Sequence, residues 1–204
     1  MRARPPSFLP FVIVQLFLLT LLVDAEAMGQ TDPLYEVYAI SYARAGESFP
    51  LSEIALGADS TSVLDINFMI WLLKGSDGKN VLVDSGFLPD SEFKKNYSLP
   101  MLDYVRPDQA VARLGISPED ISDIVITHLH WDHADGVGLF PNAQIWIQKA
   151  ELEYYAGEAW QPEMKHYGVD PRDIVRLVDL NTKGRVTLID GDAQEIIDGV
   201  TVYT

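Results

Sequence analysis

The most informative stretch of the chain is residues 127–133, which read Thr127-His128-Leu129-His130-Trp131-Asp132-His133. Three of the four histidines lie here within six positions, together with one carboxylate. Imidazole and carboxylate groups suit zinc and similar divalent ions when thiolate is absent, and the chain has no cysteine. The stretch therefore predicts a metal site built from histidine and carboxylate.

The spacing within this stretch indicates how it would bind metal. His128 and His130 are two positions apart, so on an extended segment they project toward the same side and can chelate one ion. Asp132 and His133 follow a bend and can face a second ion. The alternative is a solvated polar loop whose histidines make ordinary hydrogen bonds. A cluster directly after a strand favours the metal site, because sites in α/β folds form at strand ends.

The surrounding sequence alternates between strand and helix patterns. We expect strands over residues 34–44, 63–73, 80–84, 123–127, 144–148, 185–189 and 200–204. We expect helices over residues 108–114, 149–156 and 171–180, and a loop between Pro89 and Pro107. The turn signal at residues 76–78 makes the second and third strands a hairpin. Strands interleaved with helices predict an α/β (α+β layered) domain, and the hairpin argues against a purely parallel sheet.

Composition narrows the classes of function. The chain has 204 residues, 48% hydrophobic and 10% aromatic, which excludes a disordered chain and suits one domain. Fifteen Lys and Arg face 30 Asp and Glu, giving a net charge of −15. That balance argues against nucleic acid as a partner and against electrostatic docking on an anionic membrane. The absence of cysteine excludes a disulfide scaffold.

The first 27 residues have the pattern of a secretory signal peptide. Two arginines precede a mostly apolar run at residues 8–23, and Ala25-Glu26-Ala27 is a small-x-small cleavage site. A retained membrane anchor is the alternative, but the run is shorter than the roughly 20 apolar residues that span a bilayer. We therefore expect export to the periplasm or the extracellular space, and no membrane association of residues 28–204 after cleavage.

Three segments together resemble one known family. The pattern His128-x-His130-x-Asp132-His133 resembles the signature of the metallo-β-lactamase-fold hydrolases. Residues 81–86, Val-Leu-Val-Asp-Ser-Gly, resemble the buried strand of that superfamily that ends in Asp-Ser/Thr-Gly. Residues 138–145, followed by residues 149–151, are similar to the segment after the motif in the N-acyl-homoserine-lactone lactonase branch. The resemblance covers roughly residue 66 to the C-terminus.

This resemblance implies a fold, a cofactor and a reaction. The fold would be an αββα sandwich, and the reaction hydrolysis of a lactone ring, or a similar small-molecule ester, by a metal-bound hydroxide. His128 and His130 would bind the first of two zinc ions, and Asp132 and His133 the second. Asp132 would also act as the catalytic proton shuttle. Asp84 would orient a metal-bound histidine, unless it only caps the turn at Asp84-Ser85-Gly86.

The chain departs from the family pattern in its number of ligands. The family uses a further histidine, a bridging aspartate and a late histidine, and residues 200–204 resemble the strand that leads into the first of these. His166 lacks ligand spacing and is expected to be a surface or packing residue. We therefore expect the N-terminal part of the sandwich, with two ligands per metal, where a catalytic zinc usually has three.

Several alternatives stay open on the sequence alone. Activity of the same fold as a glyoxalase-II-like thioesterase or a β-lactamase is the nearest. A non-catalytic, exported metal-binding fragment is another. Trp131, Phe87 and Leu88 would either line an apolar substrate pocket or simply pack, and Asp190, Asp192 and Asp198 fit hairpin turns better than a calcium loop. The sequence gives no signal for the oligomeric state.

Overall fold

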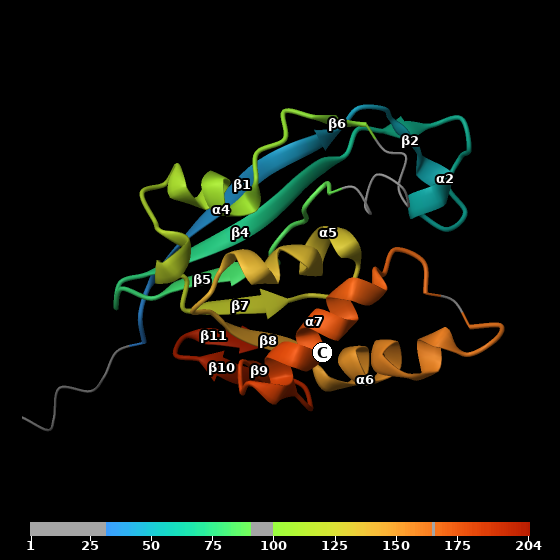
Figure 1. Ribbon diagram of the computed structural model, residues 1–204. Coiled ribbons are helices and arrows are strands. Elements are labelled where there is room, and N and C mark those ends of the chain that lie inside the picture. The colour runs from blue at the N-terminus through green and yellow to red at the C-terminus, as the bar shows by residue number, and fades with distance from the viewer. Residues whose placement is uncertain (1–31, 91–99, 165) are drawn as a thin grey trace, which may run out of the picture. The chain divides into compact units, whose positions relative to one another are not determined.

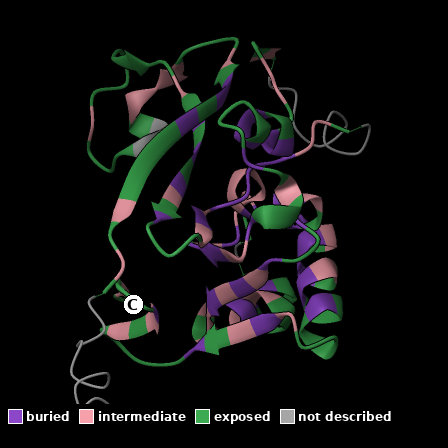
Figure 2. Ribbon diagram, turned by 90° about the vertical axis from the view of Figure 1, so that its left-hand side faces the viewer, coloured by how far each residue is buried: buried purple, intermediate pink, exposed green. Residues whose placement is uncertain are grey.

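The computed structural model describes residues 32–90, 100–164 and 166–204. Its two longest strands, β1 (Tyr35–Ala45) and β4 (Asn67–Gly75), pair in antiparallel orientation (Figure 1). Along β4 buried residues alternate with exposed ones, as a strand with one covered face requires (Figure 2). On the covered face, Phe68, Ile70 and Leu72 are buried. The predicted signal peptide at residues 1–27 lies outside the described residues.

The main sheet has seven strands in the order β6-β1-β4-β5-β7-β8-β9. Its other strands are β5 (Asn80–Val83), β6 (Met101–Leu102), β7 (Asp123–Ile126), β8 (Gln144–Gln148) and β9 (Val186–Ile189). The pair β4 and β5 is antiparallel, whereas β5, β7, β8 and β9 run parallel to one another. The sheet is therefore mixed, as the sequence predicted, and the fold is α/β.

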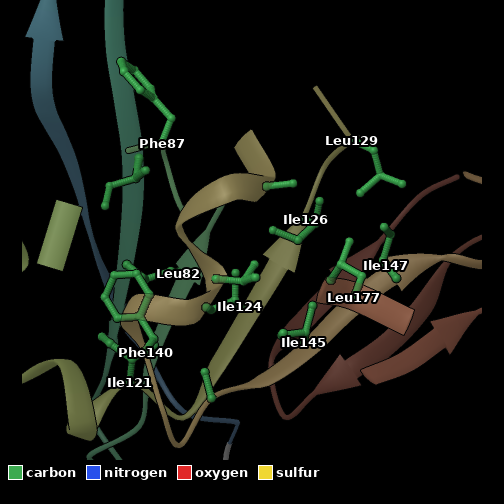
Figure 3. Packing of buried hydrophobic residues seen from close by; sticks show 14 of the residues in the cluster. Leu82, Phe87, Ile121, Ile124, Ile126, Leu129, Phe140, Ile145, Ile147 and Leu177 are labelled. Atoms are coloured by element: carbon green, nitrogen blue, oxygen red, sulfur yellow. The ribbon is translucent and has the colours of Figure 1, made fainter. Parts of the chain in front are cut away.

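Helices cover one face of this sheet. They are α4 (Pro107–Ala112), α5 (Trp131–Ala134), α6 (Lys149–Ala156) and α7 (Pro171–Thr182), with 3₁₀ turns at Pro118–Asp120, Asp135–Leu139 and Glu158–Trp160. Leu177 of α7 packs in one core cluster with Ile145 and Ile147 of β8 (Figure 3). The Asp170 carboxylate caps α7 by accepting a hydrogen bond from the backbone N–H of Arg172, and Pro171 occupies the first turn.

The opposite face of the sheet is covered in part. The hairpin of β10 (Gln194–Ile197) and β11 (Val200–Val202) places Ile197 against Val81 and Val125. On the neighbouring strand β4, Met69 and Trp71 keep 42% and 43% of their surface exposed. This apolar face is therefore only partly covered within the described residues. Within the described residues no helix is both long enough and apolar enough to span a bilayer.

Several element boundaries differ from the sequence prediction. The expected strand at residues 63–73 divides into β3 (Val63–Leu64), which pairs with β2 (Phe49–Pro50) beside the short helix α2 (Leu51–Ile54), and β4. The expected loop before Pro107 contains β6, which pairs with the end of β1. Strand β10 was not predicted.

The aromatic residue Trp160 lies in the 3₁₀ turn after α6 and is 37% exposed. Its ring lies 4.2 Å from that of His166, centroid to centroid. The 3₁₀ turn that follows α6 carries it away from the core face of the helix.

Candidate metal centre

The histidine stretch lies at the carboxyl end of the parallel strands β5 and β7. Because these strands are parallel and adjacent, the residues that follow them meet at one edge of the sheet. Asp84 follows β5, and its backbone N–H donates to the carbonyl of Val125 in β7 at 2.8 Å. His128 follows β7 two residues after its last strand residue. This topology brings Asp84 to the histidines.

The structure brings the four predicted ligands together. The ring of His128 lies 4.5 Å from that of His130 and 4.0 Å from that of His133, centroid to centroid. Helix α5 begins at Trp131, so Asp132 and His133 lie in a helical turn after the extended segment, as the bend in the prediction requires. The Nε2 atom of His133 is 3.4 Å from Asp132 Oδ2.

Asp84 contacts both ends of the histidine stretch. Its Oδ2 atom is 2.7 Å from His133 Nδ1, and its Oδ1 atom accepts a hydrogen bond from the backbone N–H of Thr127 at 2.9 Å. The Thr127 hydroxyl also donates to this carboxylate, and it lies 3.0 Å from His128 Nδ1. Asp84 is buried and holds a positive φ of 62°. Such contacts are those of a carboxylate that orients a histidine ring.

The charges of the cluster are coupled. Burial alone would lower the pKa of His133, but the hydrogen bonds and charges of Asp132 and Asp84 outweigh it and raise the pKa to about 10. Burial alone would raise the pKa of Asp132, but the hydrogen bond and charge of His133 keep it below its usual value. Burial, with the charges of His133 and His130, lowers the pKa of His128. Asp132 is therefore ionised at neutral pH, and His128 is neutral with a free electron pair.

The side-chain types of the four predicted ligands suit zinc, but two ligands per ion are fewer than the three that a catalytic zinc usually has. Neutral imidazole and carboxylate are zinc ligands, so His133, whose pKa of about 10 keeps it protonated at neutral pH, would have to release a proton on binding. Asp84 supplies the outer carboxylate that ligating histidines usually have. Among residues 32–90, 100–164 and 166–204, no three or more His, Cys, Asp and Glu side chains are arranged to hold a metal ion. The fourth histidine, His166, is exposed, and its Nδ1 atom can donate to the carbonyl oxygen of Ala159 at 3.1 Å, outside the cluster.

Two further elements hold the backbone of the histidine stretch, and the sequence did not reveal either role. The Glu151 carboxylate in α6 accepts a hydrogen bond from the backbone N–H of Leu129 at 2.9 Å. The carbonyl of Gly168, in the loop before α7, accepts from the backbone N–H of Trp131 at 2.7 Å. In the sequence, Glu151 was mentioned only as part of residues 149–151, which resemble a segment of the family. A single glycine such as Gly168 gives no indication that it contacts a distant loop.

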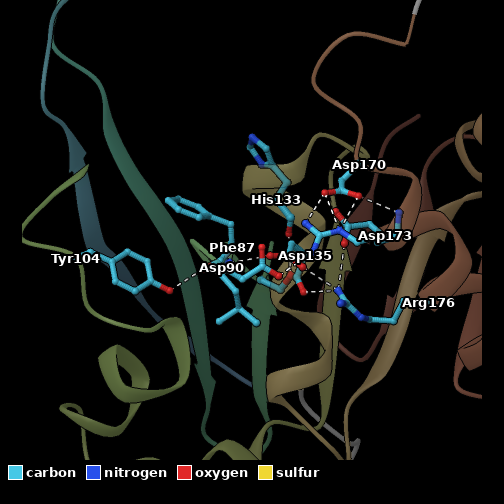
Figure 4. Close-up of polar contacts among 11 residues, drawn as sticks. Phe87, Asp90, Tyr104, His133, Asp135, Asp170, Asp173 and Arg176 are labelled. Carbon is cyan, nitrogen blue, oxygen red and sulfur yellow. Dashed lines mark hydrogen bonds and ion pairs between the residues drawn. The ribbon is translucent and has the colours of Figure 1, made fainter. Parts of the chain in front are cut away.

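A group of carboxylates around Arg176 holds the loop after the ligands (Figure 4). One guanidinium nitrogen of Arg176 donates to the carbonyl and carboxylate of Asp135 and to the carboxylate of Asp173. The second oxygen of Asp135 accepts from the backbone N–H of Leu88, which ties the segment after β5 to the same point. Burial, with the negative charge of Asp135, raises the pKa of Asp173.

Aromatic side chains pack beside the cluster. The rings of Phe87 and Trp131 meet edge to face at 4.8 Å, and Phe68 lies within 5.7 Å of both. Phe87 is fully buried, so it packs rather than lines a pocket. A separate cavity of about 240 Å³ adjoins the ligands and is lined by Tyr42, Ile66, Asn67, Phe68, Met69, Trp71, Asp84, Asp132 and His133.

Of the acidic residues near the C-terminus, Asp198 lies in the turn between β10 and β11, whereas Asp190 and Asp192 lie in the connection between β9 and β10. Asp190 pairs with Lys149 at 2.8 Å, and Asp192 accepts from the backbone N–H of Thr204. The backbone carbonyl of Asp198 accepts from the Tyr35 hydroxyl. Each of the three therefore makes a contact that links separate segments of the chain.

Comparison with known proteins agrees with this fold. The model of the metallo-beta-lactamase superfamily matches residues 69–201. An N-acyl homoserine lactonase of Bacillus cereus is 38% identical over 101 residues, which is 43% of this chain and 40% of the relative. The chain thus spans about two fifths of the length of that relative.

Solved structures share the architecture. A mutant of AiiA from B. thuringiensis with N-decanoyl-L-homoserine bound at its active site superposes with a TM-score of 0.61 at 23% identity, covering 84% of this chain and 65% of the other. AidC, described as a dizinc quorum-quenching lactonase in complex with a product, gives 0.51 at 18% identity, covering 81% and 62%. These likenesses establish the fold. Because the superfamily model covers more than half of the 204 residues, the chain belongs to the metallo-beta-lactamase superfamily.

Proposed function

We propose that this chain forms the metal-binding part of a zinc-dependent hydrolase that opens lactone rings of the N-acyl-homoserine-lactone type. The observation that carries the proposal is the meeting of His128, His130, Asp132 and His133 at the edge of β5 and β7, above the carboxylate of Asp84. The curated relative named as an N-acyl homoserine lactonase supports the substrate class.

The side chains divide between two ions by their position. We assign His128 and His130, on the extended segment, to the first zinc, and Asp132 and His133, on the first turn of α5, to the second. Zinc bound there would polarise a carbonyl and lower the pKa of a coordinated water to about 7. Asp84 would keep the His133 ring oriented through its contact with Nδ1, which leaves Nε2 for the ion.

Asp132 is the residue we assign to proton transfer. It is ionised at neutral pH, because the hydrogen bond and charge of His133 outweigh the effect of burial on its pKa. In lactone hydrolysis the oxygen of water bonds to the carbonyl carbon, and the C–O bond of the ring breaks. The proton released by water must reach the departing alkoxide, and the product is a hydroxy acid. A carboxylate at this position can accept that proton and deliver it.

The test is made on the full-length protein with two matched histidine variants. His130→Ala should lose bound zinc and lactone hydrolysis together, whereas His166→Ala, at an exposed histidine outside the cluster, should keep both. Zinc per chain is measured by elemental analysis, and activity against a panel of lactones, thioesters and β-lactams. Full activity in His130→Ala would overturn the proposal. A preference for thioesters or β-lactams would reassign the substrate, and zinc binding without turnover would leave only a metal-binding role.

We further propose that the protein is exported and that its first 27 residues are removed. The support is the pattern of two arginines, an apolar run and Ala25-Glu26-Ala27. Mass spectrometry of the protein from a cell fraction outside the cytoplasm should give an N-terminus at Met28. An intact N-terminus in the membrane fraction would instead indicate a retained anchor.

A further inference from the structure

The backbone of the histidine stretch is held at three alternate residues by three different elements. The N–H of Thr127 donates to Asp84 after β5, the N–H of Leu129 to Glu151 in α6, and the N–H of Trp131 to the Gly168 carbonyl. His128 and His130 occupy the two positions between these backbone anchors. In an extended segment alternate residues point to opposite sides, so holding the odd positions fixes the direction of the even ones.

The middle anchor is made by the carboxylate of Glu151 in α6, a side chain to which the sequence pattern gave no role. Strand β8 runs parallel to β7, and α6 begins at the residue after β8. The first turn of α6 therefore arrives at the same edge of the sheet as the histidines, and Glu151 lies in that turn. Its carboxylate reaches back across 22 positions to the backbone between the two rings.

The surroundings make this contact hard to replace by water. The Leu129 side chain is fully buried in the main core cluster, so its backbone cannot move outward without uncovering it. A buried N–H that loses its acceptor carries the full cost of its lost hydration. The loop would then shift to find another acceptor, and the flanking rings would turn with it.

We propose that Glu151 is a positioning residue for His128 and His130, acting through the backbone of Leu129. The inference rests on the proposed metal site. The feature that matters is the length of the side chain and its acceptor oxygen, not its charge. Glutamine keeps both the length and the acceptor, whereas aspartate keeps the charge and is one methylene shorter. Glu153, exposed on the same helix, provides a matched control.

The first arm measures the anchor in the full-length, metal-free protein. Amide exchange followed by NMR should show Leu129 exchanging at least about 10-fold faster in Glu151→Ala and Glu151→Asp. Glu151→Gln and the control Glu153→Ala should stay close to the wild type. Unchanged protection in Glu151→Ala would overturn the inference whatever the protein does with metal. Should Glu151→Ala not fold, the comparison of Glu151→Asp with Glu151→Gln decides alone.

The second arm measures zinc affinity by competition with a chelating dye. The dissociation constant should rise by about 10- to 100-fold in Glu151→Ala, less in Glu151→Asp, and remain within a few-fold of the wild type in Glu151→Gln. Lost protection of Leu129 with unchanged zinc affinity would overturn the positioning role while the proposed function stands. Failure of the wild type to bind zinc would overturn both.

Discussion

Asp84 Oδ2 lies 2.7 Å from His133 Nδ1, although 49 positions separate the two residues in the sequence. The same carboxylate accepts the backbone N–H of Thr127, the first residue of the stretch that His133 ends. One side chain after β5 thus closes the histidine stretch at both ends. The orientation of the rings therefore depends on a residue that binds neither of the proposed ions.

Two replacements of Asp84 should distinguish its effect on the orientation of the His133 ring from the strain of its own backbone. Asp84 has a φ of 62°, which asparagine tolerates and alanine does not. Asp84→Asn should fold and bind zinc about 10- to 100-fold more weakly, because an amide replaces the carboxylate at His133. Asp84→Ala should lose a further 1–2 kcal/mol, roughly, of unfolding free energy. Zinc titration and urea unfolding measure the two effects. Asp103→Asn, at an exposed aspartate with a φ of 54°, should leave zinc affinity unchanged.

Gly168 should tolerate no side chain, because of its contact with His130. A Cβ at Gly168 would lie 3.1 Å from the His130 ring, and its φ is 77°. Gly184 has a similar φ of 74° with nothing within 4 Å of its Cβ. Both alanine variants should lose about 1–2 kcal/mol of stability through backbone strain. Only Gly168→Ala should also weaken zinc binding, and equal zinc affinity in the two variants would contradict this account.

Asp173 should make stability fall as pH rises. Burial and the charge of Asp135 raise its pKa from 3.8 to about 8, so the folded chain keeps a proton that the unfolded chain has released between these values. Unfolding free energy should therefore decrease through that range by up to about 1.4 kcal/mol per pH unit from this group. Above pH 8 the contribution is constant. Asp173→Asn should flatten the dependence of the unfolding free energy on pH, measured by urea unfolding of the variant and the wild type at each pH. Asp179→Asn, at an exposed residue of the same helix, should leave this dependence unchanged.

Gly136 should be the least replaceable residue of the loop after α5. A Cβ there would overlap the carbonyl oxygen of Ser85, and its backbone N–H donates to the Gly86 carbonyl at 2.8 Å. Because the obstacle is backbone on a buried segment, Gly136→Ala should cost about 3 kcal/mol or more. Gly138→Ala, two residues later, meets nothing closer than 3.9 Å and should change stability little. Thermal unfolding of the two variants gives the comparison.

Local patterns predicted the elements whose boundaries are set locally. Strand β8 and helix α6 have the expected bounds, because the alternation of residues 144–148 changes directly into a helical pattern. The expected strand at residues 63–73 is interrupted, since Val63 and Leu64 pair with β2 whereas β4 pairs with β1. Strand β10 was missed because it has only four residues and follows a turn, so its sequence shows little alternation of apolar and polar residues. It pairs with β11, the next strand along the chain.

In the site, too, local sequence predicted some of the contacts and gave no indication of others. The histidines and Asp132 are close in sequence, so their spacing alone predicts that they meet. Asp84 was found because its strand has a recognisable ending. Glu151 and Gly168 accept hydrogen bonds from backbone N–H groups of the stretch, and Asp135, Asp173 and Arg176 meet through the packing of α7. No residue pattern encodes such contacts, because they depend on how β8 and α7 dock.

The three backbone anchors also determine when the site can form as the chain folds. His128 and His130 are neighbours from the start, but Asp84, Glu151 and Gly168 reach them only after β5, β8 and the segment before α7 have docked. Long-range contacts form late, because loop closure must precede them. A zinc ion therefore meets oriented ligands only in a chain that is already folded. In contrast to a zinc finger, this protein would gain its metal as a product of folding and not as its trigger.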